Sequence, residues 1–204
     1  MRDASASDDF KILSLSGGGY KGLLTATVLA VLEDDVGEPL GRYFDLICGT
    51  SIGGILALAL ATEKSMSEIR DLIAEQGEDV FPGGVSKKGT TYKLFNHLFK
   101  SYYTSSGLKN ILFEIFSTSL LGECVHRCFV PAVNFTKGEG QLFKTPHHPS
   151  FKTDHERLIS DIALATSAAP VYLPMHEFES QRYLDGGLIA NSPALFAIHD
   201  AEYF

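Results

Sequence analysis

Hydrophobic and polar positions follow two alternating patterns along the first third of the chain. Apolar runs at residues 10–15 and 43–48 are typical of buried strands, and each ends in a glycine-containing turn. Apolar residues at helical spacing follow each turn, at residues 20–32 and at Ile52–Ala61. The second segment is apolar nearly all round, which predicts a deeply buried helix. Strand, turn and helix, twice in succession, predict an α/β fold with a mostly parallel sheet and helices on both faces.

The same reading predicts elements over most of the remaining chain. We expect helices at 67–76, 106–116 and 159–168, strands at 127–134, 141–144 and 182–184, and a last helix from about residue 192. Residues 77–104 differ, because they are rich in glycine, lysine and aromatic residues. An amphipathic stripe at 94–102 can lie at a membrane surface, form a lid or pack on the protein's own core.

The composition is that of an ordinary globular protein, with 45% hydrophobic and 21% charged residues. A length of 204 residues suits one domain with one core. Acidic residues (25) outnumber basic residues (17), which gives a formal net charge of −8. This balance argues against a nucleic acid polymer as partner, because phosphate contacts need a basic face. The polar start predicts a disordered lead-in at 1–9, followed by one domain over 10–204.

The cysteines and the longest apolar run indicate the cellular compartment in which the protein is found. The three cysteines, an odd number, indicate a reducing environment. Cys124 and Cys128 flank His126, which is only half of a metal site, so we expect no metal there. The first residues lack the pattern of a secretory signal, and the apolar run at 55–61 is too short to cross a bilayer. We therefore expect a soluble cytoplasmic protein.

The first candidate site is Gly49-Thr50-Ser51-Ile52-Gly53, a G-x-S-x-G pattern between a predicted strand and a predicted helix. This setting is typical of a nucleophile elbow, in which the serine sits in a strained turn. Gly49 and Gly53 avoid collisions with the neighbouring strand and helix. The helix N-terminus behind Ser51 favours developing negative charge. The alternative is an ordinary strand-to-helix turn in which Ser51 caps the helix.

The second candidate site is the loop Ser16-Gly17-Gly18-Gly19-Tyr20-Lys21-Gly22. Its G-x-G-x-x-G spacing also fits a dinucleotide site, but the second strand runs into the serine turn where such a site needs a terminal acidic residue. Backbone N–H groups of Gly17, Gly18 and Gly19 can instead form an oxyanion hole beside Ser51. Each such donor stabilises the transition state by about 3–4 kcal/mol. Lys21 adds positive charge near the same helix end.

The third candidate site is Asp185-Gly186-Gly187, at the end of a predicted strand. A carboxylate followed by two glycines can approach another loop closely. Its distance from Ser51 in sequence is 185 − 51 = 134 residues, so only the fold can bring the two together. The alternative interpretation is a common Asp-Gly turn.

Taken together, these motifs resemble those of the patatin-like phospholipases, in the same order and at plausible intervals. The resemblance covers about residues 10–200 and implies a patatin-like catalytic domain over 10–204. The matching stretches are residues 16–22 (SGGGYKG), 49–53 (GTSIG), 165–174 (ATSAAPVYLP) and 185–187 (DGG), with Asn191-Ser192-Pro193 following.

The resemblance implies a Ser–Asp dyad, with Ser51 as nucleophile and Asp185 as general base. It implies an oxyanion hole in the glycine loop, a membrane phospholipid as substrate, and chemistry without a metal or cofactor. The runs KILSLSGGGYKG and FDLICGTSIGG are similar to those of patatin-like effectors in bacterial anti-phage systems. Cyclic nucleotides activate these effectors, so a cyclic nucleotide activator and action at the inner membrane surface are also implied.

Two departures from the family pattern stand out. Ser16 occupies the position where many members have Asp, which affects loop support more than chemistry. The chain stops at Phe204 where members usually continue, so we expect a C-terminally truncated form. His199 is the one histidine after Asp185, as a triad order would require. It falls in a predicted helix, and we expect it to be a packing residue.

Three rival interpretations remain at this point. A nucleotide-binding module would use the G-x-G-x-x-G loop for phosphates, would bind dinucleotides and would not hydrolyse esters. A broader esterase or thioesterase would prefer soluble short-chain esters over vesicles. A catalytically silent fragment would result if a missing C-terminal region completed the core.

Overall fold

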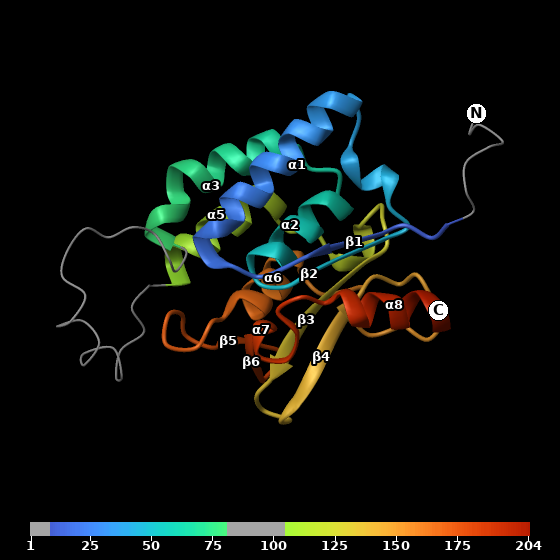
Figure 1. Cartoon of the computed structure of the whole chain (residues 1–204). Helices are drawn as coiled ribbons and strands as arrows, with labels where there is room; N and C mark the ends of the chain where they lie inside the picture. Colours follow the sequence, from blue (N-terminus) through green and yellow to red (C-terminus); the bar gives the residue numbers. More distant parts are fainter. Residues whose placement is uncertain (1–8, 81–104) are drawn as a thin grey trace.

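The computed structural model describes residues 9–80 and 105–204 (Figure 1). Apart from Asp9, the expected lead-in at 1–9 lies outside these residues. The expected amphipathic stripe at 94–102 also lies outside them.

The described residues form one mixed sheet of six strands. The order in space is β1 (Ile12–Leu15), β2 (Leu46–Gly49), β3 (Cys128–Asn134), β6 (Gln181–Asp185) and β5 (His176–Phe178), and β4 (Glu139–Lys144) also pairs with β3. Strands β1, β2 and β3 are parallel, whereas β4 and β6 run antiparallel to β3. Strand β5 is antiparallel to β6 and so has the direction of β1–β3. The predicted α/β fold with mostly parallel strands is confirmed.

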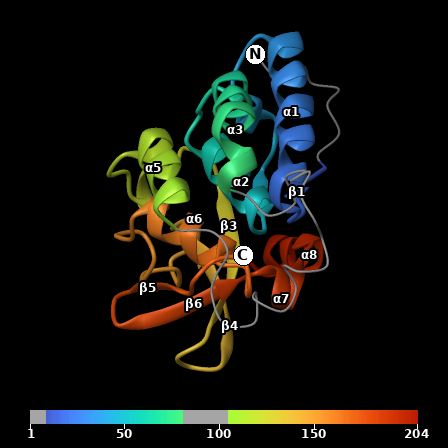
Figure 2. The ribbon, with the colours of Figure 1, turned by 90° about the vertical axis from the view of Figure 1, so that its left-hand side faces the viewer.

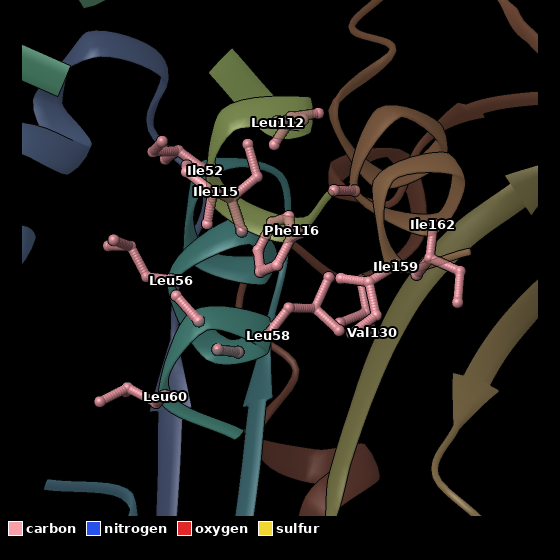
Figure 3. Packing of buried hydrophobic residues seen from close by; sticks show 14 of the residues in the cluster. Ile52, Leu56, Leu58, Leu60, Leu112, Ile115, Phe116, Val130, Ile159 and Ile162 are labelled. Carbon is pink, nitrogen blue, oxygen red and sulfur yellow. The ribbon is translucent and has the colours of Figure 1, made fainter. Parts of the chain in front are cut away.

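Helix α2 (Ile52–Ala61) is the centre of the hydrophobic core. All ten of its residues are buried, as its continuous apolar sequence predicts. It packs against β2 and β3 on one side and is surrounded by other helices, including α6 (Ile159–Ser167). Figure 3 shows Ile115 and Phe116 of α5 (Ser105–Phe116) near α2, and both belong to the same cluster as its buried leucines. Helices α1 (Gly22–Val36) and α3 (Met66–Val80) lie on the side of α2 that faces away from the sheet (Figure 1).

Helices cover both faces of the sheet, as predicted. Successive side chains of a strand point to opposite faces, so Ile47 belongs to the α2 cluster while Leu46 and Cys48 face the other way. On that second face they form a small cluster with Phe129 and with Ala197 of α8 (Ala194–Tyr203). Figure 2 shows α8 on the opposite side of β3 and β4 from α5 and α6.

The predicted helices and strands are all present, with ends that differ by up to four residues. Several short elements were not predicted: β5, α7 (Gly187–Ala190) directly after Asp185, and the 3-10 helices at Leu40–Tyr43 and Leu121–Glu123. The main difference is in α1, where the apolar positions at helical spacing, Leu24 and Val28 among them, are exposed. The buried face is made by Ala26, Leu29 and Ala30 instead. None of the described helices is long and apolar enough to cross a membrane.

Candidate active site

Two strands meet end to end on one edge of β3, and this places the candidate residues together. Strand β4 occupies one edge of β3 from Phe129 to Asn134, so β2 and β6 must share the other. Strand β2 pairs Cys48 with Phe129, and the antiparallel β6 pairs Asp185 with Ala132, three residues further along β3. Three residues span about 10 Å of strand, so the turn after β2 arrives at the end of β6.

The turn after β2 has the geometry of a nucleophile elbow. Ser51 has φ 56° and ψ −127°, a strained conformation for a residue other than glycine. A Cβ on Gly49 would overlap the Gly53 carbonyl, and a Cβ on Gly53 would overlap the Leu15 carbonyl of β1. Ser51 stands at the N-cap position of α2 but makes no capping hydrogen bond with its side chain. This observation disfavours the alternative in which Ser51 serves as a helix cap.

Asp185 lies at the end of β6 and is 7% exposed. Its carboxylate Oδ1 accepts a hydrogen bond of 2.6 Å from the Gly187 N–H. The Ser51 hydroxyl is close enough to lower the pKa of the carboxylate as well. Burial raises the pKa of Asp185, and the Gly187 N–H and the Ser51 hydroxyl offset only part of that effect. A Cβ on Gly186 would overlap the Pro131 carbonyl of β3, so glycine permits the close turn.

The glycine loop lies against Ser51. A Cβ on Gly17 would be 3.2 Å from the Ser51 Cβ, and the Gly17 N–H donates to the Asn191 carbonyl at 3.0 Å. The Gly17 N–H is therefore already used and does not remain free for an oxyanion. The N–H groups of Gly18 and Gly19 have no hydrogen-bond partner among the described residues. Gly19 has φ 57°, a left-handed conformation that favours glycine.

The supporting residues of the glycine motif have different surroundings. Gly22 begins α1, and a Cβ there would overlap the side chain of Ile52, the first residue of α2. This glycine therefore lets the starts of α1 and α2 approach closely. Lys21 is exposed and forms no ion pair with any residue that the structure describes. It lies in the turn between the glycine loop and α1.

Three supporting residues did not emerge from the sequence as site residues. Thr50 is fully buried, and its Oγ1 donates to the Ala190 carbonyl at 2.7 Å. Asn191 holds the glycine loop through its carbonyl. The Oγ1 of Thr166 accepts the Ser51 N–H at 3.0 Å. All three fall inside the family-like stretches noted above, and that is the signal by which they could have been found.

The histidines and cysteines have other surroundings. The His199 ring packs on the Tyr203 ring with centroids 4.4 Å apart, and the His176 Nε2 lies 2.8 Å from the Asp161 Oδ1. Burial raises the pKa values of Cys48 and Cys124 to about 12, which keeps both thiols protonated. Within residues 9–80 and 105–204, no three His, Cys, Asp or Glu side chains are grouped as a metal site would require.

This arrangement can support acyl transfer. It joins a serine hydroxyl in a strained turn, a buried carboxylate whose pKa that hydroxyl lowers, and two N–H groups on the neighbouring loop that have no partner among the described residues. Such a combination defines the class of α/β proteins that carry a nucleophile elbow. The chain belongs to the patatin-like phospholipase family, whose model matches residues 13–198.

The names of similar proteins are consistent with this family assignment. The chain is 47% identical over 195 residues to a cGAMP-activated phospholipase of Pseudomonas aeruginosa, covering 96% of this chain and 57% of the relative. It is 40% identical over 205 residues to a cGAMP-activated phospholipase of Vibrio cholerae, covering 93% and 57%. It is 32% identical over 212 residues to Patatin-like protein 2 of Arabidopsis thaliana, covering 92% and 51%. The chain thus spans little more than half the length of these relatives.

A solved structure has the same fold. VipD from Legionella pneumophila superimposes with a TM-score of 0.55 at 16% identity, covering 88% of this chain and 46% of that one. At this identity the likeness concerns the fold alone.

Proposed function

We propose that this chain is a serine acyl hydrolase that cleaves the acyl esters of phospholipids through Ser51 and Asp185. The observation that carries the proposal is that Ser51, strained and without a capping role, lies beside the buried Asp185 carboxylate, whose pKa its hydroxyl lowers. A dyad needs this contact, because Asp185 must take the proton of Ser51 directly.

In the proposed mechanism, the Ser51 Oγ attacks the ester carbonyl while Asp185 takes the hydroxyl proton. The carbonyl oxygen becomes an oxyanion, which the free N–H groups of Gly18 and Gly19 stabilise. Collapse of this intermediate expels the alcohol, which receives the proton from Asp185, and leaves an acyl ester on Ser51. Water then attacks the acyl ester, Asp185 again acts as base, and the fatty acid is released as Ser51 regains its proton.

Burial of Asp185 supports its role as base. An ordinary aspartate is too weak a base to accept a proton from a serine at neutral pH, and burial raises its pKa towards the operating pH. The hydrogen bond to Gly187 fixes the carboxylate orientation relative to Ser51. The two glycines after Asp185 thus contribute both the tight turn and a donor.

The proposed substrate and regulation rest on the relatives. Two bacterial relatives are named as cGAMP-activated phospholipases, so we propose membrane phospholipid as substrate and a cyclic nucleotide as activator. The proposed setting is the cytoplasmic face of the bacterial inner membrane, where lipid degradation would serve anti-phage defence. The domain that carries this activity is residues 10–204.

The test compares phospholipid vesicles with a soluble short-chain ester, each with and without a panel of cyclic nucleotides. The proposal predicts that the wild type releases fatty acid from vesicles and that Ser51→Ala does not. Ser150→Ala is the control and should keep the activity, because Ser150 is an exposed serine far from Asp185 in sequence. Turnover of the soluble ester alone under every condition would favour a broader esterase. Dinucleotide binding without hydrolysis of either substrate would favour the nucleotide-binding alternative.

A further inference from the structure

Thr166 lies between the two proposed catalytic residues and is fully buried. Its hydroxyl oxygen Oγ1 accepts the Ser51 N–H at 3.0 Å and donates to the Pro131 carbonyl of β3 at 2.7 Å. A hydroxyl has one proton to donate and lone pairs to accept with, so the single side chain makes both bonds. It ties the strained serine to the central strand of the sheet.

The main chain around Thr166 holds the other member of the dyad. The Thr166 carbonyl accepts the Gly186 N–H at 3.2 Å, and the Ala168 carbonyl accepts the Asp185 N–H at 3.0 Å. The end of α6 therefore binds the turn that carries Asp185 through its main chain. One residue, Thr166, contacts the nucleophile with its side chain and the turn of the base with its carbonyl.

A glycine in α2 makes room for the Thr166 methyl group. A Cβ on Gly54 would lie 2.9 Å from the Thr166 Cγ2 and 3.0 Å from the Val130 Cγ1. These distances are too short for carbon atoms, so Gly54 is a condition for the position of Thr166. The absence of a side chain at Gly54 leaves room for the rotamer in which the Thr166 hydroxyl accepts the Ser51 N–H.

We propose that Thr166 is a positioning residue that sets the geometry between Ser51 and Asp185. This inference rests on the proposed hydrolase function. With the Ser51 N–H bound to Thr166, the serine is held in its strained conformation and its N–H is directed away from the oxyanion. The N–H groups of Gly18 and Gly19, which have no partner among the described residues, are then available to stabilise the oxyanion.

The test replaces the hydroxyl by a methyl group of the same shape. Thr166→Val loses both the donor and the acceptor, whereas Thr166→Ser keeps them. Thr145→Val is the matched control, because the Thr145 hydroxyl is also buried, accepts the Cys128 N–H at 2.9 Å and donates to the Cys128 carbonyl at 3.1 Å. It lies at the start of β3, where it also lies 2.8 Å from the His147 Nδ1, and it makes no bond to Ser51 or to the Asp185 turn.

The readouts are kcat and KM on a soluble ester, and the rate of Ser51 labelling by a fluorophosphonate. We expect Thr166→Val to lower kcat and the labelling rate by about 10- to 100-fold with little change in KM, because a small misplacement of a reacting group has an effect of this size. Thr166→Ser should restore most of the rate, and Thr145→Val should keep it. If Thr166→Val does not fold, Thr166→Ala replaces it in the same comparison.

The outcomes separate this inference from the function. A wild type that turns over ester, with equal kcat in Thr166→Val and Thr145→Val, overturns the positioning role and leaves the hydrolase intact. A folded wild type that neither turns over ester nor is labelled, with or without cyclic nucleotides, overturns the hydrolase and this inference with it. A loss of rate in Thr166→Val that Thr166→Ser does not restore also contradicts the role of the hydroxyl.

Discussion

At the scale of single residues, the glycine positions allowed the tight turn around Ser51 to be predicted from the sequence. The sequence predicts that Gly49 and Gly53 prevent collisions around Ser51, and the overlaps with the Gly53 and Leu15 carbonyls confirm that reasoning. The use of the Gly17 N–H by Asn191 could not be predicted, because the partner is 191 − 17 = 174 residues away in sequence. The same holds for Thr166 and Ser51, 115 residues apart. Spacing within a motif shows which turns are tight, but it does not show which distant groups fill them.

At this scale, the raised pKa of Asp185 makes a prediction about stability. Burial favours the protonated form in the folded state, so the wild type loses stability as pH rises from the ordinary value of 3.8 through the raised pKa. Asp185→Asn removes the buried charge. We expect this variant to be inactive and yet to have a higher melting temperature than the wild type at about pH 8.

The difference in melting temperature should shrink as pH falls and vanish below the ordinary pKa of aspartate, where both chains are neutral at this position. Asp34→Asn, which removes an exposed carboxylate of α1, is the control and should melt like the wild type. Thermal melts from about pH 3 to about pH 8 measure the effect. A lower melting temperature for Asp185→Asn at the upper end of this range would contradict the account.

At the scale of elements, the long periodic segments could be predicted and the short or partly exposed features could not. Helix α2 was predicted with its observed ends and its burial. Its continuous apolar sequence suits only the interior of the protein. Strand β5 and helix α7, of three and four residues, are too short for a periodic signal. In α1 the core accepts Ala26 and Ala30 and leaves Leu24 exposed, because a close approach to its neighbours requires small residues. Tertiary packing decides which face of a helix is buried.

The attachment of α8 gives a prediction at this scale. Asp200 of α8 is 3% exposed, its Oδ2 lies 2.9 Å from the His147 Nε2, and it forms an ion pair with Lys144. Burial alone would raise the pKa of Asp200, but His147 and Lys144 outweigh burial and lower it. Its contribution to stability is therefore present above the pKa of an unfolded aspartate and is lost as pH falls through the lowered value.

Asp200→Asn leaves the Lys144 charge partly buried without its counter-ion. We expect a loss of about 3 kcal/mol in the free energy of unfolding at neutral pH, measured by urea denaturation. The loss should become smaller below about pH 4. Glu202→Gln, an exposed carboxylate on the same helix, should unfold like the wild type. Equal unfolding midpoints for Asp200→Asn and Glu202→Gln at neutral pH would contradict the proposed attachment.

At the scale of the whole molecule, the arrangement of strands brings the proposed dyad together. The alternation of strands and helices predicts the fold class, but it does not predict that β6 would continue the line of β2 along one edge of β3. That placement brings Asp185 to Ser51 across 134 residues of sequence. Here the order of four motifs along the chain carried more information than any local pattern, because it allowed the family to be identified.

The measurement that tests the central claim most directly is covalent labelling of the protein by a fluorophosphonate, with the modified residue identified by mass spectrometry. The account predicts one modified serine, Ser51, with labelling lost in Ser51→Ala and strongly reduced in Asp185→Asn. Repeating the reaction with cyclic nucleotides tests the proposed activation, which predicts faster labelling in their presence. A folded protein that stays unlabelled under every condition, or is labelled equally well in Ser51→Ala, would contradict the account.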